Sequence, residues 1–161
     1  IRSIFLFDTS SLTSGATISA TILSLLGTGK TDTDNKSPNI DIYTTTPVSN
    51  TSLSAGDYAQ FGTTSQTGSP IAYADWSTTG YNVFTFDATG IGNISKTGIS
   101  TFGTRNANYD VAGVESEMTT SNGLAEFSCR YSDYIWGSNK PKLVVTFSLP
   151  PAQAGFLFLM I

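Results

Sequence analysis

The chain has 161 residues but no histidine, and its only cysteine is Cys129. Without histidine it cannot build Ser-His-Asp or Cys-His nucleophile systems, or a zinc or iron site with histidine ligands. A single cysteine excludes an intrachain disulfide and a thiolate metal cluster, and we expect Cys129 to pack as a small buried hydrophobe. The sequence also has no phosphate-binding loop and no dinucleotide fingerprint. We therefore predict no cofactor and no enzymatic activity.

Charge is scarce as well, at 12% of the residues, where typical domains carry about 25%. Eight basic residues are scattered from Arg2 to Lys142 against twelve acidic ones, which gives a net charge of −4. Binding to nucleic acid or to anionic lipid requires clustered cations. The longest clean apolar run is 156–161, far short of the roughly 20 residues of a transmembrane helix. The sequence predicts neither a nucleic-acid partner nor a membrane span.

What the sequence does contain is period-two alternation of apolar and polar residues between Gly, Asn, Asp and Pro turn signals. This pattern is typical of half-buried strands, and it predicts an all-β fold, an antiparallel jelly-roll-like β-sandwich. One or two short helical turns are expected, over 54–62 and 90–96, and the polar segment 27–39 is expected to be a loop. The strands are predicted at 4–7, 18–26, 40–45, 81–87, 99–105, 124–131 and 143–149.

The same alternation predicts which side chains face inward. On 18–26 it places Ile18, Ala20, Ile22, Ser24 and Leu26 on one face. Trp76 and Tyr81 are also expected in the core, because large aromatic side chains dominate the cores of sandwiches. The predicted core consists of Phe5, Phe7, Ile18, Ile22, Phe84, Phe86, Phe102, Val145 and Phe147.

Carboxylates are the remaining candidates for chemistry. Glu115, Glu117, Glu126 and Asp133 lie in the C-terminal third, and two carboxylates are enough to hydrolyse a glycosidic bond. Nothing in their spacing pairs them, however, so solvated charge is the favoured interpretation.

Asp32, Asp34 and Asn35 resemble the start of a calcium loop, because oxygen ligands at alternate positions suit calcium. The sixth position of that loop should be glycine, and the twelfth should be glutamate where this chain has Tyr43. A polar surface turn is therefore the favoured interpretation, and no metal site is predicted.

Aromatic residues near loops can stack on sugar rings, or they can pack in the core and at its rim. For Tyr109, Tyr134 and Trp136, which lie among Asn, Asp and Ser, both interpretations stay open. The loop aromatics are Tyr73, Trp76, Tyr81, Tyr109, Tyr131, Tyr134 and Trp136.

The C-terminal segment divides the chain into a sandwich at 1–149 and a Pro-hinged apolar tail at 150–161. Apolar side chains left in water would favour aggregation, so we expect the tail to be buried as an added β-strand. Its sheet is either the chain's own or that of a neighbouring subunit. The residues of this strand are Phe156, Leu157, Phe158, Leu159, Met160 and Ile161.

Three segments at the start and end of the sandwich, 2–12, 16–25 and 140–147, resemble the DNRLRE-type domain, which is also classed among carbohydrate-binding modules. Segments 75–82 and 102–110 are similar to a variant of that domain in structural proteins of phages and uncultured microbes. The resemblance implies a β-jelly roll on secreted, cell-surface or virion proteins, some of which bind acidic polysaccharide. No binding residue is carried over.

Three functions follow, in order of preference. The first is a non-catalytic structural or display module of an extracellular or virion assembly, of the phage tail, fibre or decoration type. Its partners are other copies of itself or neighbouring subunits. The second is a glycan-binding module for cell-surface or matrix polysaccharide. The third is a carboxylate-based polysaccharide hydrolase or lyase. The expected location is extracellular, on a cell surface or on a virion.

Overall fold

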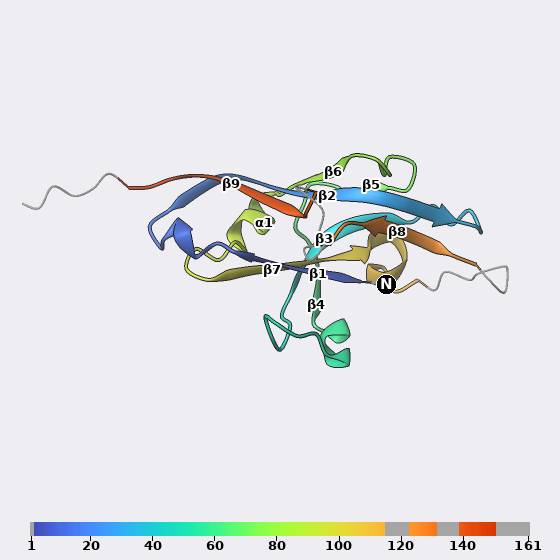
Figure 1. The fold of residues 1–161 in the computed structure, drawn as a ribbon, viewed down its shortest axis with the longest axis horizontal. Helices are drawn as coiled ribbons and strands as arrows, with labels where there is room; N and C mark the ends of the chain where they lie inside the picture. Colours follow the sequence, from blue (N-terminus) through green and yellow to red (C-terminus); the bar gives the residue numbers. More distant parts are fainter. Residues whose placement is uncertain (1, 115–122, 132–138, 151–161) are drawn as a thin grey trace, which may run out of the picture.

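The computed structural model describes residues 2–114, 123–131 and 139–150, and these form an antiparallel β-sandwich (Figure 1). The first sheet has the strand order β1-β7-β3-β4, with β5 also pairing with β3. The second sheet has the order β6-β2-β8, with β9 also pairing with β2. The strands are β1 (Ser3–Asp8), β2 (Thr17–Asp32), β3 (Asn39–Thr45), β4 (Phe61–Ser65), β5 (Ile71–Ala72), β6 (Tyr81–Thr85), β7 (Ile99–Asn106), β8 (Ala125–Cys129) and β9 (Lys142–Ser148).

The chain passes from one sheet to the other between β1 and β2, between β2 and β3, and from β5 through β6 and β7 to β8. This alternation is the jelly-roll-like connectivity expected from the sequence, so the predicted fold class is confirmed. The short helical segments are η1 (Ser10–Leu12), η2 (Ala55–Ala59), α1 (Ala88–Gly92) and the π-type turn η3 (Ala107–Val111). Two of them, η2 and α1, overlap the predicted turns.

Strand β2 is longer than predicted. It ends at Asp32 and so includes the first part of the segment 27–39, which was expected to be a loop. Its first half pairs with β9 from Thr17↔Ser148 to Ser24↔Lys142, and its second half pairs with β8. A β-bulge interrupts the first pairing between Ile18 and Ala20. An extra residue at a bulge shifts the alternation of a strand by one position, so the residues after it point to the opposite face of the sheet from the one expected. Thr21, Leu23 and Leu25 are therefore buried, where Ile22 was predicted to be.

The core lies between the sheets and contains seven of the nine predicted residues. Phe5, Phe84, Phe86 and Phe102 are buried in it, and Phe86 meets Phe102 edge to face with ring centroids 4.9 Å apart. Phe7, Ile18 and Val145 pack against it. Two predictions are wrong: Ile22 lies on the outer face beyond the bulge, and Phe147 is 42% exposed near the end of β9.

The two aromatics predicted for the core from their surroundings also differ in outcome. Trp76 is buried, with its ring centroid 5.1 Å from that of Phe127. Tyr81 is only half-buried, because it pairs with Leu26 on the outer face of the second sheet. Its ring lies instead under the Lys142 ammonium, 4.2 Å from the ring centroid.

One long side of the sandwich, which we call the closed side, joins the two sheets through backbone hydrogen bonds. Thr67 and Phe86 form a bridge across it, and the Asp87 N–H donates to the Gln66 carbonyl over 3.1 Å. Behind this bridge the Asp41 carboxylate, which is 2% exposed, accepts the Ser65 and Thr67 hydroxyls over 2.7 and 2.5 Å. Buried carboxylates are stable only when they are hydrogen-bonded in this way.

The outer face of the first sheet is covered by the connection between β3 and β4, which carries η2 (Figure 1). Phe61 packs against β7 at Gly103, where an added Cβ would come within 2.3 Å of the phenyl ring. Asp57 fixes the connection by accepting the backbone N–H groups of Ser54 and Val48, which lowers the pKa of its carboxyl. Tyr43 is buried beneath, and this burial raises its pKa to about 12.

Candidate functional site: the open side of the sandwich

The other long side, which we call the open side, leaves strand β1 at the edge of the first sheet. Among the described residues β1 pairs only with β7, from Ser3↔Thr104 to Asp8↔Ile99. Every second residue of an edge strand directs its backbone N–H and C=O groups away from the sheet, where another strand can bind them. The side chains of Ile4, Phe5, Leu6 and Phe7 make this edge apolar on both of its faces.

A groove of about 560 Å³, which we call the inner groove, follows the inner face of this edge. One wall is β1 itself, from Ser3 to Phe7. The opposite wall consists of Cys129 at the end of β8 and of Arg130, Tyr131, Lys140 and Pro141, which lie between β8 and β9 in the chain. The groove therefore lies between the edges of the two sheets, where no backbone pairing among the described residues closes the sandwich.

A smaller hollow of about 160 Å³, which we call the outer pocket, lies on the other face of the same edge. Ile4 and Leu6 form its floor, and residues Ser49 to Leu53 of the β3–β4 connection form its wall. Asn50 lines both hollows. The two hollows therefore flank one edge strand, and a strand added there would find a hollow for each of its two faces.

The chemistry of the inner groove is apolar at its base and cationic at its rim. Burial raises the pKa of the Cys129 thiol, which makes it a poor nucleophile at neutral pH. Arg130 and Lys140 supply positive charge at the rim, and Tyr131 between them in sequence is 62% exposed. The groove can therefore bind apolar side chains, while its rim suits anionic groups or a stacked ring.

The start of β1 is anchored by one carboxylate and two guanidinium groups. Asp110 in η3 accepts Nε of Arg2 and Nε of Arg105, each over 2.9 Å. The hydrogen bonds from Arg105, followed by those from Arg2, hold the pKa of the Asp110 carboxyl well below its usual range. Arg2 also lies under the Tyr58 ring, 4.2 Å from its centroid. These groups bond to one another, so the cluster fixes the edge strand in place.

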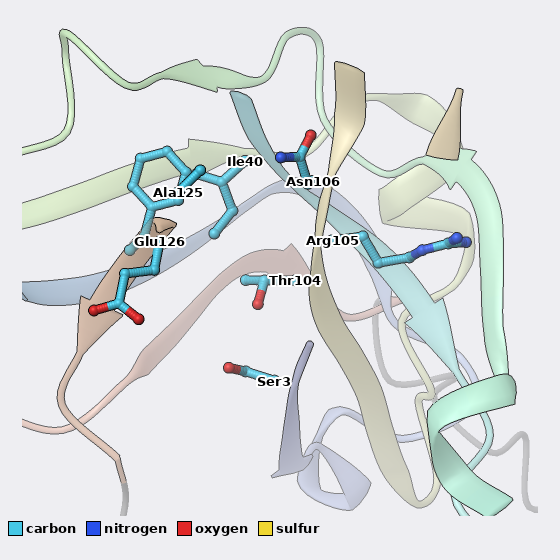
Figure 2. Close-up of a pocket in the computed structure, with 8 residues that line it drawn as sticks. Ser3, Ile40, Thr104, Arg105, Asn106, Ala125 and Glu126 are labelled. Atoms are coloured by element: carbon cyan, nitrogen blue, oxygen red, sulfur yellow. The ribbon is translucent and has the colours of Figure 1, made fainter. Parts of the chain in front are cut away.

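Glu126 is the one predicted catalytic carboxylate within the described part of the chain. It lines a cavity of about 110 Å³ with Ser3, Thr104 and Asn106 at one end of the sandwich. Arg105 contributes to the same lining but extends its guanidinium away toward the β3–β4 connection (Figure 2). Glu115, Glu117 and Asp133 lie outside the described residues. The described lining thus contains one carboxylate, whereas glycosidic hydrolysis requires two.

The calcium-like segment forms a turn, as favoured from the sequence. The Asp32 carboxylate accepts the backbone N–H groups of Lys36 and Ser37 over 2.8 and 2.7 Å, and Asn35 has a positive φ of 53°. Such a turn uses the oxygens that a cation would need. Among residues 2–114, 123–131 and 139–150, no three His, Cys, Asp or Glu side chains gather as candidate ligands.

The sequence left the role of three loop aromatics undecided, and one of them, Tyr109, lies within the described residues. The Tyr109 hydroxyl donates to the Lys36 carbonyl over 2.6 Å, and its backbone N–H donates to the Asn106 side chain. Tyr109 thus holds η3 against the turn after β2. Tyr134 and Trp136 lie outside the described residues, and so does the predicted strand from Phe156 to Ile161.

Sequence reasoning did not identify the residues that line the open side, because the position of a groove depends on which strands become edges. One signal was available: Ile4-Phe5-Leu6-Phe7 is apolar at consecutive positions, while most strands of this chain alternate. A run of this kind is buried on both faces. The run therefore indicated a strand whose outer face is buried by other residues as well as its inner face.

Comparisons with known proteins add no further information on the site. No family model, no curated protein and no solved structure matches the chain. Across the described residues, none of the helices has the length and apolar character needed to cross a membrane.

Proposed function

We propose that the chain is a non-catalytic structural or display module that assembles with copies of itself or with neighbouring subunits, in an extracellular or virion setting. The observation that carries the proposal is the apolar edge of β1 between its two hollows. Proteins that act alone protect such edges with charges, prolines or covering segments. An edge left apolar on both faces is typical of a surface that another chain covers.

The outer face of the second sheet supports the same proposal. Val83 of β6 and Val144 of β9 are 52% and 55% exposed there, and Val144 pairs with Ile22 of β2, whereas Val83 pairs with Ser24. Exposed apolar side chains that gather on one face mark interaction surfaces. The buried Asp41 and the partly buried Asp110 form their hydrogen bonds within the fold itself.

Sedimentation velocity and negative-stain electron microscopy over a range of protein concentrations test this function. We expect ordered oligomers or filaments whose size increases with concentration. A chain that stays monomeric at millimolar concentration, with no defined particle under any condition, would contradict the proposal.

A glycan-binding module is the second candidate, favoured by Tyr131 between the cations Arg130 and Lys140 at the rim of the inner groove. An exposed ring stacks on a sugar, and cations attract its carboxylate or sulfate groups. Calorimetry with a polyuronate and a neutral glucan separates the possibilities. If this function is correct, the polyuronate alone binds, and Tyr131→Ala weakens it at least tenfold. The hydrolase or lyase hypothesis stays third, with Glu126 as its described carboxylate.

A further inference from the structure

We propose that the free edge of β1 is completed by an added β-strand, residues 156–161 of a second copy of this chain. The inference rests on the proposed assembly function and deepens it, because it names the partner segment and the surface that receives it.

The first argument is the shape of the receiving surface. A strand added beside β1 directs alternate side chains to opposite faces of the sheet. On one face they enter the inner groove toward Phe5, Phe7 and Cys129, and on the other they meet the outer pocket over Ile4 and Leu6. The surface therefore suits a segment that is apolar at consecutive positions.

The second argument is the match in sequence pattern and length. Segment 156–161, Phe-Leu-Phe-Leu-Met-Ile, is apolar at all six positions and carries no charge. Strand β1 also has six residues, so a partner of equal length would extend for about 20 Å. Bound at the edge, the segment satisfies the backbone groups of β1 and buries both of its own faces. This is the pattern of β-strand addition, in which main-chain bonds give affinity and side-chain pockets give selectivity.

The position at which β9 ends indicates which copy supplies the strand. β9 ends at the end of the molecule opposite the start of β1, with Pro150 beside Gly15 (Figure 1). Pro150 restricts Leu149 to extended conformations as the chain leaves the sheet. To reach its own β1 after Pro150, the chain would have to reverse its direction and cross the roughly 10 Å between the sheets. Insertion into a second copy requires neither.

If the tail of one copy binds the edge strand of the next, the contact is heterologous and repeats into rings or filaments. If two copies exchange their tails, the same contact closes a dimer. Each molecule then contributes one tail and receives one.

Cys129 allows a direct test, because it is the only cysteine of the chain and lies in the wall of the inner groove. Six donor proteins carry Cys129→Ala and one cysteine at each position from 156 to 161. The acceptor is the native chain with a mass tag. Each donor is mixed with the acceptor, oxidised mildly and analysed by mass spectrometry for a disulfide to Cys129. A donor with Cys129→Ala and Ser14→Cys, which places a thiol on an exposed turn residue, is the matched control.

We expect a mixed disulfide only at the one or two tail positions that face Cys129, at least tenfold above the Ser14→Cys control, because a disulfide requires Cα atoms within about 7 Å of each other. Equal yields at all six positions, or yields no higher than the control, would overturn the inference. A further variant keeps Cys129 and adds a tail cysteine at one of the reactive positions. If it forms its disulfide within the monomer at nanomolar concentration, the tail belongs to its own sheet and the second copy is wrong.

Assembly measurements separate this inference from the function on which it rests. Leu6→Lys places a charge in the outer pocket, and Val83→Lys places one on the outer face of the second sheet. We expect Leu6→Lys to abolish tail cross-linking and oligomers, and Val83→Lys to leave the cross-linking unchanged. If native oligomers persist in Leu6→Lys and in a chain ending at Gly155, assembly stands but the added strand is refuted. If the native chain forms no oligomers at all, the proposed function itself fails.

Discussion

The two long sides of the sandwich differ in how the edges of the two sheets meet. On the closed side, the bridge between Thr67 and Phe86 connects the sheets through main-chain bonds, and Asp41 fixes the segment behind it. On the open side, β1 and the second sheet face each other across the inner groove without such a bridge in the described residues. The closed side uses its polar groups in bonds within the molecule, whereas the open side leaves main-chain groups and apolar surface that the proposed partner strand would cover.

This difference indicates where substitutions should affect the fold and where they should affect association. Changes on the closed side break packing and hydrogen bonds that exist within one molecule. Changes on the open side leave most of those contacts intact and alter the edge that, in our proposal, a second molecule covers. The following substitutions test that division.

The largest effect is expected for Phe86→Ala on the closed side. Phe86 is buried against Phe102, so its truncation leaves a cavity and should lower the free energy of unfolding by about 3–5 kcal/mol. Phe147→Ala is the matched control, because this phenylalanine is 42% exposed, and it should cost less than about 1 kcal/mol. Urea denaturation of both variants measures the contrast. Equal losses would show that Phe86 is not buried as described.

The next effect concerns the anchor of the open edge and depends on pH. Asp110→Asn removes the charge that holds Arg2 and Arg105 and should cost about 1.5–3 kcal/mol at pH 6. The folded-state pKa of Asp110 is lowered by these partners, so its stabilising contribution is present above about pH 4 and decreases as the pH falls below that value. The stability difference between native protein and variant should therefore shrink toward pH 2.

Urea denaturation at both pH values measures this difference, and Asp75→Asn, at an exposed carboxylate, is the control. A difference that is constant from pH 6 to pH 2 would refute the role of the Asp110 charge.

A smaller effect is expected for Gly90→Ala in α1. An added Cβ would lie 2.2 Å from the Gln66 carbonyl oxygen and 2.8 Å from the Phe86 ring, on the closed side. Relieving these contacts should cost about 1–3 kcal/mol. Gly92→Ala in the same helix meets nothing within 4 Å and should raise stability by up to about 1 kcal/mol. Thermal unfolding of the two variants separates the cost of crowding Gln66 and Phe86 from the gain in helix propensity. A Gly90→Ala variant as stable as the native protein would mean that α1 can shift away from the Thr67–Phe86 bridge.

The smallest effect is expected for Val83→Lys on the outer face of the second sheet. Val83 is 52% exposed, so the monomer should change by no more than about 0.5 kcal/mol. Urea denaturation at a concentration below the onset of association measures the monomer alone. A large loss would indicate that this face is covered within the single chain.

Much of the fold could be predicted from the sequence, because period-two alternation reports the burial of each strand face. The errors arise where a tertiary feature changes that period. The bulge between Ile18 and Ala20 exchanged the two faces of β2, so Ile22 was assigned to the core in place of Leu23 and Leu25. A bulge adds one residue without changing the composition of a strand, so the pattern carries no mark of it.

Strand β4 shows a second limit. Phe61 was included in a helical turn ending at Gly62, but it begins β4 because Gly103 on β7 leaves room for its ring. That space depends on a residue more than forty positions away, which local patterns do not contain. The open side is of the same kind, because its hollows exist only once β1 has become an edge. The turn at Asp32 was easier to anticipate, since it depends on neighbouring residues of the chain.

The ladder between β2 and β9 gives the molecule a mechanical property. Thr17 pairs with Ser148 and Ser24 with Lys142, so β9 lies antiparallel to β2 along its whole length. A pull on the segment after Ser148, directed along the axis of β9, slides that strand against β2 and loads all their hydrogen bonds together in shear. Bonds loaded together fail at a higher force than bonds that open one after another. A module linked to its neighbours through this segment would therefore resist tension along the strand direction and yield more easily to a sideways peel.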